Sequence, residues 1–422
     1  MRGWGKYCFL ILLIQLFFML PAYTATESIS LNNAVNTALE NNRDYKIAGM
    51  KAREADEQVN MAWDQLMPFI ESEAAFTRQY AEKGFMSLSD GQVDLKLVQV
   101  RFAVNPGVFY NTLQVARNAR IIAEEDVRRI KNEVVYSVIK SYFDYLLCDE
   151  IVKLRKESVD MYASNLNDVE NLYKRGSVPK FEFLQAGVEL KNQEPALLEA
   201  ENNRRTALEI FNYILGYDDN RYEPDRSILD RDVKRVSSDG AGERIERLVL
   251  LALRNRPEVI QLVKKGEIAG DSAERDSSYY LWPTFSLSGY YGYSKADPNT
   301  IDTGMVPMDF SNITGDDRWH DSWQVRIAAT YRWNSLLPFD STRDSKRTEE
   351  LRQEEAEQEL GRVKRMISIS VKSSYNKLIT SCLTIQSQRE NVKTASEGLR
   401  IARESYRAGI IRNSELLSAQ LG

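Results

Sequence analysis

The stretch Tyr173-Lys174-Arg175-Gly176, followed by Glu182-Phe183-Leu184-Gln185-Ala186, returns 233 residues later as Tyr406-Arg407-Ala408-Gly409 and Glu415-Leu416-Leu417-Ser418-Ala419. The same offset pairs Ser141-Tyr142 with Ser374-Tyr375. Nearer the N-terminus, Ala38-Leu39-Glu40-Asn41 is matched by Ala252-Leu253-Arg254-Asn255, and Pro68 by Pro283. Self-similarity between segments that follow one another in the same order at a long spacing indicates a duplicated unit. The chain is therefore predicted to contain two copies of one long unit that mixes helices with strands.

The first copy, residues 26–216, is predicted to be mostly helical. Apolar residues at helical spacing predict a helix over 31–65. No proline or glycine occurs from 108 to 175, which predicts one very long helix that ends at a C-cap glycine, Gly176. Pro179 then opens a last helix that runs to about residue 216.

Between the first two helices, the sequence changes to alternation and predicts two strands, over about 69–80 and 93–104. A turn-like stretch is expected between them, with Glu82-Lys83-Gly84 followed by Asp90-Gly91. The alternation of the second strand slips near Leu97-Val98, which indicates either a β-bulge or an error in the assigned phase of the strand.

The second copy, residues 244–422, follows a polar linker over 217–243 and repeats this order. Its elements are predicted as a helix over 243–280, strands over about 284–294 and 322–334 with a long loop over 295–321 between them, and a long helix over 341–408. Only 13 residues follow Gly409, whereas about 40 separate Gly176 from Gly216 in the first copy, so the last helix is expected to be incomplete and the chain truncated.

The last strand has the clearest alternation and carries the aromatics Trp323, Tyr331 and Trp333. Eleven residues with aromatics at both ends suit a tilted membrane strand with interfacial aromatic girdles. The long helices lack a wide apolar face, which favours a water-filled tube over a solid bundle.

The N-terminus and the charge restrict the setting. A basic start, an apolar run from Cys8 to Leu20 and small residues before Thr26 predict an export signal over 1–25, without a lipid anchor. Its removal changes the formal charge from −5 to −7, which gives no support for nucleic-acid binding. The remaining Cys148 and Cys382 are interpreted as packing residues and not as a disulfide.

The duplicated unit, with its two Tyr-x-x-Gly turns each followed by an acidic residue and a Leu-x-Ala stretch, resembles the TolC-like outer-membrane efflux proteins over the whole mature chain. The resemblance implies a mixed α and β membrane protein in which three chains each give four strands to one twelve-stranded β-barrel. Their helices would form an α-barrel across the periplasm. The implied function is a passive conduit in a tripartite efflux or type I secretion system, with a periplasmic adaptor (membrane fusion) protein and an inner-membrane pump as partners. Independently, four strands cannot close a barrel and an open edge is not tolerated in lipid, so self-association is expected.

The resemblance also implies a gate at the periplasmic end. Glu415 matches one of two acidic positions that narrow the family's tube, whereas Ser418 departs from the other. Tyr406 matches a gate tyrosine, and the arginine expected two residues after Gly409 is replaced by Ile411. In the first copy, Tyr173 and Glu182 have the matching spacing, and Gly176 and Gly409 resemble the tips that dock adaptors. The residues alone also allow a simpler interpretation of these positions. The glycines are then ordinary helix C-caps, the tyrosines are packing residues and the acids are solvated charges.

An enzyme is the weakest class, because the chain has one histidine and no Cys/His cluster, phosphate-binding loop or nucleophile motif. No catalytic, cofactor-binding or metal-ligating residue is therefore expected. The alternative is a periplasmic coiled-coil scaffold or adaptor that never enters the membrane. Interfacial aromatics on an alternating strand argue against it. A third possibility is that truncation leaves the product without function.

Overall fold

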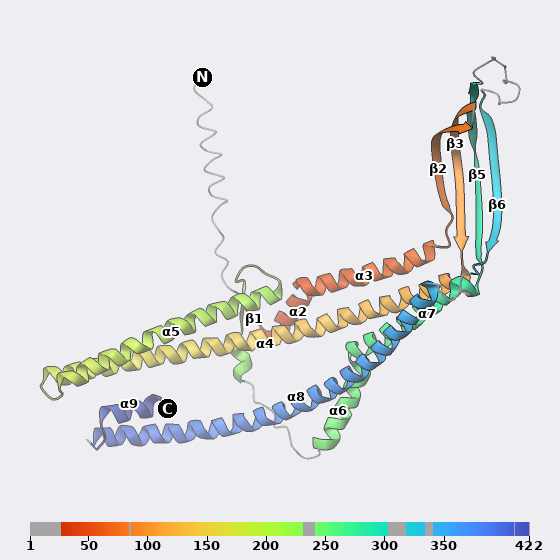
Figure 1. The fold of residues 1–422 in the computed structure, drawn as a ribbon. Helices are drawn as coiled ribbons and strands as arrows, with labels where there is room; N and C mark the ends of the chain where they lie inside the picture. Colours follow the sequence, from red (N-terminus) through yellow and green to blue (C-terminus); the bar gives the residue numbers. More distant parts are fainter. Residues whose placement is uncertain are drawn as a thin grey trace, which may run out of the picture. The chain divides into compact units, whose positions relative to one another are not determined.

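The computed structural model describes residues 27–83, 86–230, 241–302, 318–333, 341–408 and 410–421 (Figure 1). The chain divides into two compact units. We call them the helical unit (Met1–Ile47, Ile130–Glu243 and Ser373–Gly422) and the sheet unit (Ala48–Arg129 and Arg244–Lys372). Each unit draws on both predicted repeats, and the repeat boundaries stay a prediction. The predicted export signal over 1–25 lies outside the described residues.

The two long helices are confirmed as α4 (Pro106–Lys174) and α8 (Ser341–Arg407), of 69 and 67 residues. At 1.5 Å per residue, each is about 100 Å long. The predicted helix after Pro179 is α5 (Lys180–Leu215), and α9 (Asn413–Leu421) follows α8. None of the helices in the described part of the chain has an apolar stretch of the length that crossing a bilayer requires.

The predicted first helix is divided in two, α2 (Leu31–Asn41) and α3 (Arg43–Asp64). At the break, Asn42 has φ −57° and ψ 130°. Its side-chain oxygen accepts from the Tyr45 amide at 3.1 Å, and its nitrogen donates to the Ile214 carbonyl at 2.9 Å. Asn42 therefore caps α3 and links it to α5, which periodicity alone does not reveal.

A second break divides the helix predicted over 243–280 into α6 (Ala241–Asn255) and α7 (Pro257–Leu281). Pro257 at the first turn restricts the preceding residue to extended geometry, and Arg256 has φ −72° and ψ 128°. Asn41 and Asn255, which the sequence repeat pairs, are the last residues of α2 and α6. The two breaks thus lie at matched positions.

The core of the helical unit forms where α4 meets α2 and α5. Val138, Tyr142 and Leu146 of α4 and Phe211 and Leu215 of α5 are all at most 2% exposed. The Tyr142 hydroxyl donates to the Asp225 carbonyl at 2.7 Å.

The predicted polar linker is partly structured. Its residues Tyr222–Pro224 form β4, which pairs in parallel with β1 (Glu27–Ile29), and Arg226–Asp230 form the 3-10 helix η1. Tyr217, Tyr222 and Ile228 pack against the core. These apolar side chains are interspersed among Asp, Asn and Ser, and the polar residues are the reason why the sequence predicts a linker here. Residues 231–240 lie outside the described part of the chain.

The sheet unit contains an antiparallel four-stranded sheet in the order β2-β3-β5-β6 (Figure 1). Its strands are β2 (Phe69–Lys83), β3 (Met86–Val104), β5 (Thr284–Asp302) and β6 (His320–Thr330). All four predicted strands are present, and β2, β3 and β5 are longer than expected.

Three strand predictions are corrected. Asp90-Gly91 does not form a turn, because Gly91 lies within β3 and pairs with both neighbouring strands. Residues 295–302, expected in a loop, continue β5 against β3. Ladder pairing therefore overrides local turn propensity. The last strand, predicted over 322–334, ends at Thr330 of β6, so Tyr331 and Trp333 lie beyond it.

The predicted bulge is confirmed at Leu97. Between the pairs Glu71↔Gln99 and Glu73↔Lys96, one residue of β2 faces two of β3. The ladder with β5 shifts at the same place. The Ser72 hydroxyl donates to the Leu97 carbonyl at 2.7 Å. The extra residue keeps Leu95 and Val98 on one face of the sheet.

Candidate functional site

One face of the sheet is apolar. The ladder pairs align side chains from all four strands on it, for example Ile70, Val100, Gly289 and Val325 in one row. The apolar face comprises Ile70, Ala74, Phe76, Val93, Leu95, Val98, Val100, Phe102, Val104, Phe285, Leu287, Tyr291, Tyr293, Trp323, Val325, Ile327 and Ala329. Ile327 is 82% exposed and Trp323 is 72% exposed. Nothing in the described part of the chain covers these side chains.

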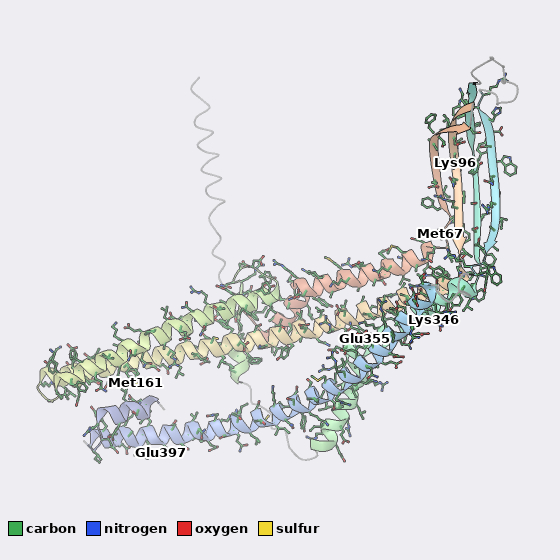
Figure 2. All side chains as sticks on the ribbon, in the orientation of Figure 1. Met67, Lys96, Met161, Lys346, Glu355 and Glu397 are labelled. Carbon is green, nitrogen blue, oxygen red and sulfur yellow. The ribbon has the colours of Figure 1, made fainter. Side chains whose placement is uncertain are left out.

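The opposite face is charged and hydrogen-bonding. It comprises Glu71, Glu73, Asp94, Lys96, Gln99, Arg101, Ser286, Ser288, Tyr290, Gln324 and Arg326. Lys96, labelled in Figure 2, contacts the Glu73 carboxylate at 2.8 Å and lies 5.7 Å from the centre of the Tyr290 ring. Arg101 pairs with Glu71. A sheet with one apolar and one charged face suits a boundary between lipid and water.

Both outer strands of the sheet have an unpaired edge. Among the described strands, β2 pairs only with β3, and β6 pairs only with β5. An exposed strand edge presents unsatisfied N–H and C=O groups, which lipid does not tolerate. In the described part of the chain, the sheet is therefore open at both sides.

Aromatic side chains gather where the sheet meets the helices. Trp63 of α3 and Phe109 of α4 meet edge to face at 5.5 Å, and Met67, labelled in Figure 2, lies in the connection from α3 to β2. The Tyr331 and Trp333 rings are 4.8 Å apart and both are exposed. The segment from Trp323 to Tyr331, which is one residue past the end of β6, is about 27 Å long at 3.4 Å per residue. At a strand tilt of about 35–45°, this segment rises about 19–22 Å, which is most of the roughly 25 Å height of the apolar band of a membrane sheet.

The first hairpin tip joins α4 to α5 and contains Tyr173, Gly176 and Glu182. Gly176 has φ +74°, and its amide donates to the Tyr173 carbonyl at 2.9 Å, so it is the predicted C-cap. The Tyr173 ring stacks on Phe183 at 5.6 Å. Glu182 lies in the first turn of α5, where the helix dipole favours a carboxylate. Within the described residues, this carboxylate makes no ion pair.

The second hairpin tip joins α8 to α9. Gly409 lies outside the described residues, but the Ile410 amide donates to the Ser405 carbonyl at 2.9 Å, as Ser177 does to Leu172 in the first tip. Tyr406 is half-buried, and Glu415 is exposed in the first turn of α9. In the described part of the chain, neither side chain makes a hydrogen bond or an ion pair. The structure therefore brings Tyr173 and Glu182 to one tip and Tyr406 and Glu415 to another.

Charged clusters lie farther along α8. Arg400 donates to Glu397 at 2.6 Å and to Glu404 at 2.7 Å; Glu397 is labelled in Figure 2. The hydrogen bond that Arg400 donates to Glu397 lowers the pKa of the Glu397 carboxyl group and raises the pKa of Arg400. These pairs are fully solvated and stabilise the helix only weakly.

A second surface was not anticipated from the sequence. On α4, large apolar residues are exposed on the side opposite the buried core: Tyr136, Ile139, Phe143, Leu147, Ile151 and Leu154. We call this set the α4 stripe. Its spacing of three and four residues is typical of a helix face that packs against another helix. The signal was present but was masked by the core-facing apolar residues on the same helix.

No group of His, Cys, Asp and Glu in the described residues is suited to hold a metal ion. Cys148 and Cys382 are free thiols. Burial raises the pKa of the Cys148 thiol.

Comparison with known proteins agrees with this geometry. The family model described as "Outer membrane efflux protein" matches residues 34–216 and 248–421, which is most of the chain. A curated relative, the probable outer membrane lipoprotein SilC of Salmonella typhimurium, is 23% identical over 189 residues. The match covers 44% of this chain and 40% of SilC, so it spans less than half of that relative.

Solved structures share the fold over nearly the whole chain. The CmeC outer membrane channel of Campylobacter jejuni superposes with a TM-score of 0.70 at 17% identity, covering 92% of this chain and 79% of CmeC. A membrane protein from Pseudomonas aeruginosa gives a TM-score of 0.67 at 16% identity, covering 92% of this chain and 86% of that one. At such identities the likeness shows the fold alone. Together with the family match, the chain belongs to the outer membrane efflux protein family and is an outer-membrane protein.

Proposed function

We propose that this protein is the outer-membrane channel of an efflux or type I secretion system, a passive conduit built from three copies. The observation that carries the proposal is the two-faced sheet with unpaired edges. Its apolar face suits lipid, and its charged face suits a water-filled lumen. Closure requires strands from other copies, because a barrel has no free edge.

Three copies of a four-stranded sheet give a twelve-stranded barrel, in which β6 of one copy pairs with β2 of the next. A barrel of this size exceeds the roughly eight strands whose interior side chains fill completely, so it leaves a lumen. The exposed aromatics at Trp282, Tyr331 and Trp333 then lie at a membrane interface, where amphipathic rings are favoured.

The helices extend the conduit into the periplasm. The α4 stripe supports packing against a neighbouring copy, because a row of exposed apolar residues at helical spacing is otherwise unfavourable in water. The charged residues of α8 suit a solvated wall.

The two hairpin tips form the periplasmic end in this proposal. Tyr173, Glu182, Tyr406 and Glu415 narrow the opening, and the turns at Gly176 and Gly409 contact a periplasmic adaptor that is joined to an inner-membrane pump. The described residues supply no partner for Tyr406 or Glu415, and in this proposal a neighbouring copy supplies one.

The test uses the full chain expressed in a bacterium with an outer membrane. Membranes are extracted with detergent, the mass of the purified particle is measured by analytical ultracentrifugation, and conductance is measured in planar bilayers. A trimer with stable single-channel conductance supports the proposal. A monomer in the soluble periplasmic fraction contradicts it and favours the scaffold.

The gate is tested separately. Replacing both Glu182 and Glu415 by glutamine lowers the preference for cations over anions in asymmetric salt. Glu390→Gln, an exposed acid on α8 away from the tip, is the matched control and leaves the preference unchanged. An unchanged preference in the tip variant removes these acids from the gate but leaves the channel proposal intact.

A further inference from the structure

The two free edges of the sheet carry opposite charge on the polar face. On β2, Glu71 and Glu73 are the charged residues of the described polar face. On β6, the charged residue of that face is Arg326. The edges therefore differ by electrostatic sign as well as by position.

The acids of β2 already have partners within the chain but keep acceptor capacity. Glu71 pairs with Arg101, and Glu73 with Lys96 at 2.8 Å. An ionised carboxylate offers about four acceptor positions, so one cation does not saturate it. The Glu73 side chain is 46% exposed.

Arg326 has no counter-charge among the described residues of its own copy. The ladder places it opposite Ser288, which stands opposite Arg101. Across the described residues, Arg326 makes no ion pair, and the nearest charge in its row is another cation. Its guanidinium is therefore available at the open edge of β6.

We propose that Arg326 of one copy pairs with the Glu71–Glu73 edge of a second copy and thereby sets the register in which β6 joins β2. This inference rests on the proposed function, because it requires the sheets of neighbouring copies to be joined. The partner is a second copy of this chain, and charge complementarity between the two edges identifies it.

The contact is within reach of ordinary strand geometry. Adjacent strands lie about 4.8 Å apart, and diagonal neighbours about 7–8 Å apart remain within reach of long side chains. The chain already shows both arrangements: Lys96 is directly opposite Glu73, whereas Arg101 is opposite Phe69 and reaches Glu71 diagonally. Two acids spaced two residues apart thus give Arg326 a target over several positions.

The pair would select among registers that the hydrophobic pattern does not distinguish. A slip of one residue exchanges the apolar and polar faces and is excluded by the membrane. A slip of two residues preserves the faces. Such slips move Arg326 along β2 and, once they are large enough, away from both acids.

Cysteine cross-linking tests proximity in the full chain. With Cys148 and Cys382 replaced by alanine, Arg326→Cys is combined with either Glu71→Cys or Glu73→Cys, and membranes are oxidised and run on non-reducing gels. One pairing is expected to yield cross-linked oligomers. Ser288→Cys in place of Arg326→Cys is the control, because it lies in the same row on an interior strand and should give none.

A double-mutant cycle tests the charge. Arg326→Gln is expected to lower the thermal dissociation midpoint of the trimer by about 2–4 °C at low salt and by less at 1 M salt. In the Arg326→Gln background, Glu71→Gln and Glu73→Gln should not weaken the contact between copies any further. The changes in the dissociation midpoint are therefore expected to be non-additive. Gln324→Ala, on the same strand and face, should show no salt-dependent shift.

The outcomes separate the two proposals. A native chain that never forms trimers rejects the channel and this inference together. A native trimer that gives no cross-link, or in which the substitutions change the dissociation midpoint additively and independently of salt, rejects only the pairing of Arg326 with Glu71 and Glu73.

Discussion

The hydroxyls of Tyr142 and Tyr375 lie at matched positions of the predicted repeats, yet only one has a described partner. Tyr142 donates to the Asp225 carbonyl at 2.7 Å, whereas the buried Tyr375 hydroxyl has no partner in the described part of the chain. Tyr142→Phe is therefore expected to lower the free energy of unfolding by about 1–3 kcal/mol, and Tyr375→Phe to change it by less than about 0.5 kcal/mol. Urea unfolding followed by circular dichroism measures both. Equal losses would show that Tyr375 has a partner.

Two glycines with positive φ provide a second matched pair. Gly176 has φ +74° with open space where a Cβ would stand, and Gly216 has φ +93° with the Asn41 carbonyl only 2.6 Å from that position. Gly176→Ala should cost about 1 kcal/mol from backbone strain alone. Gly216→Ala should cost about 1–3 kcal/mol more, because the chain must move away from Asn41. Thermal unfolding compares the two variants, and equal costs would contradict the close approach.

At the scale of the element, the bulge at Leu97 predicts which single-residue deletions in β3 preserve assembly and which abolish it. Removing Leu97 leaves Leu95, Lys96, Val98 and Gln99 in uninterrupted alternation and should preserve assembly. Removing Val100 sends the following residues of β3 to the wrong faces and should abolish it. The yield of detergent-extracted oligomer measures each deletion. Comparable loss in both would mean that the bulge itself is required.

The contact between α4 and α7 should depend on pH through Asp271. Burial raises the pKa of Asp271, although Asn118 donates to its carboxylate at 3.0 Å. The folded state therefore binds this proton more tightly than the unfolded state, and stability falls as pH rises from the ordinary value of 3.8 through the folded pKa. Asp271→Asn should accordingly raise the unfolding temperature at pH 7 and lose this advantage at pH 3. A variant less stable than the native chain at pH 7 would overturn the assignment.

Sequence periodicity was sufficient for the long elements but not for their interruptions. The absence of proline and glycine predicted α4, and the slip at Leu97 predicted a bulge. The break at Asn42 depends on hydrogen bonds to Tyr45 and Ile214, and the latter residue is far away in the chain. Such contacts cannot be read from a local pattern.

The candidate site also has a part that local sequence predicts and a part that it does not. The tips at Gly176 and Glu182 were located from spacing, because a C-cap glycine has a local signature. Arg326 has no such local signature. Its proposed role in joining two copies depends on the ladder register and on the lack of a counter-charge across β5 among the described residues. Both are properties of the paired sheet.

For the whole molecule, the α4 stripe predicts that assembly can be weakened without disturbing the core. Leu147 is 60% exposed, so Leu147→Lys should be tolerated by a single copy but should reduce the trimer fraction, because burial of the charge at a copy–copy contact is unfavourable. Ultracentrifugation in detergent measures the fraction. Lys156→Gln, on the opposite side of α4, is the control. An unchanged fraction for Leu147→Lys would place the stripe outside the assembly contacts.

The open-edged sheet also has a consequence for how the protein is made. A newly synthesised single copy exposes unpaired strand edges together with a large apolar surface. The apolar surface is unfavourable in water, and the unpaired edges are unfavourable in a bilayer. Association of several copies depends steeply on their concentration, whereas proteolysis of a solitary copy does not. We therefore expect abundance in the cell to show a threshold: below a certain rate of synthesis, quality control removes the protein faster than it matures.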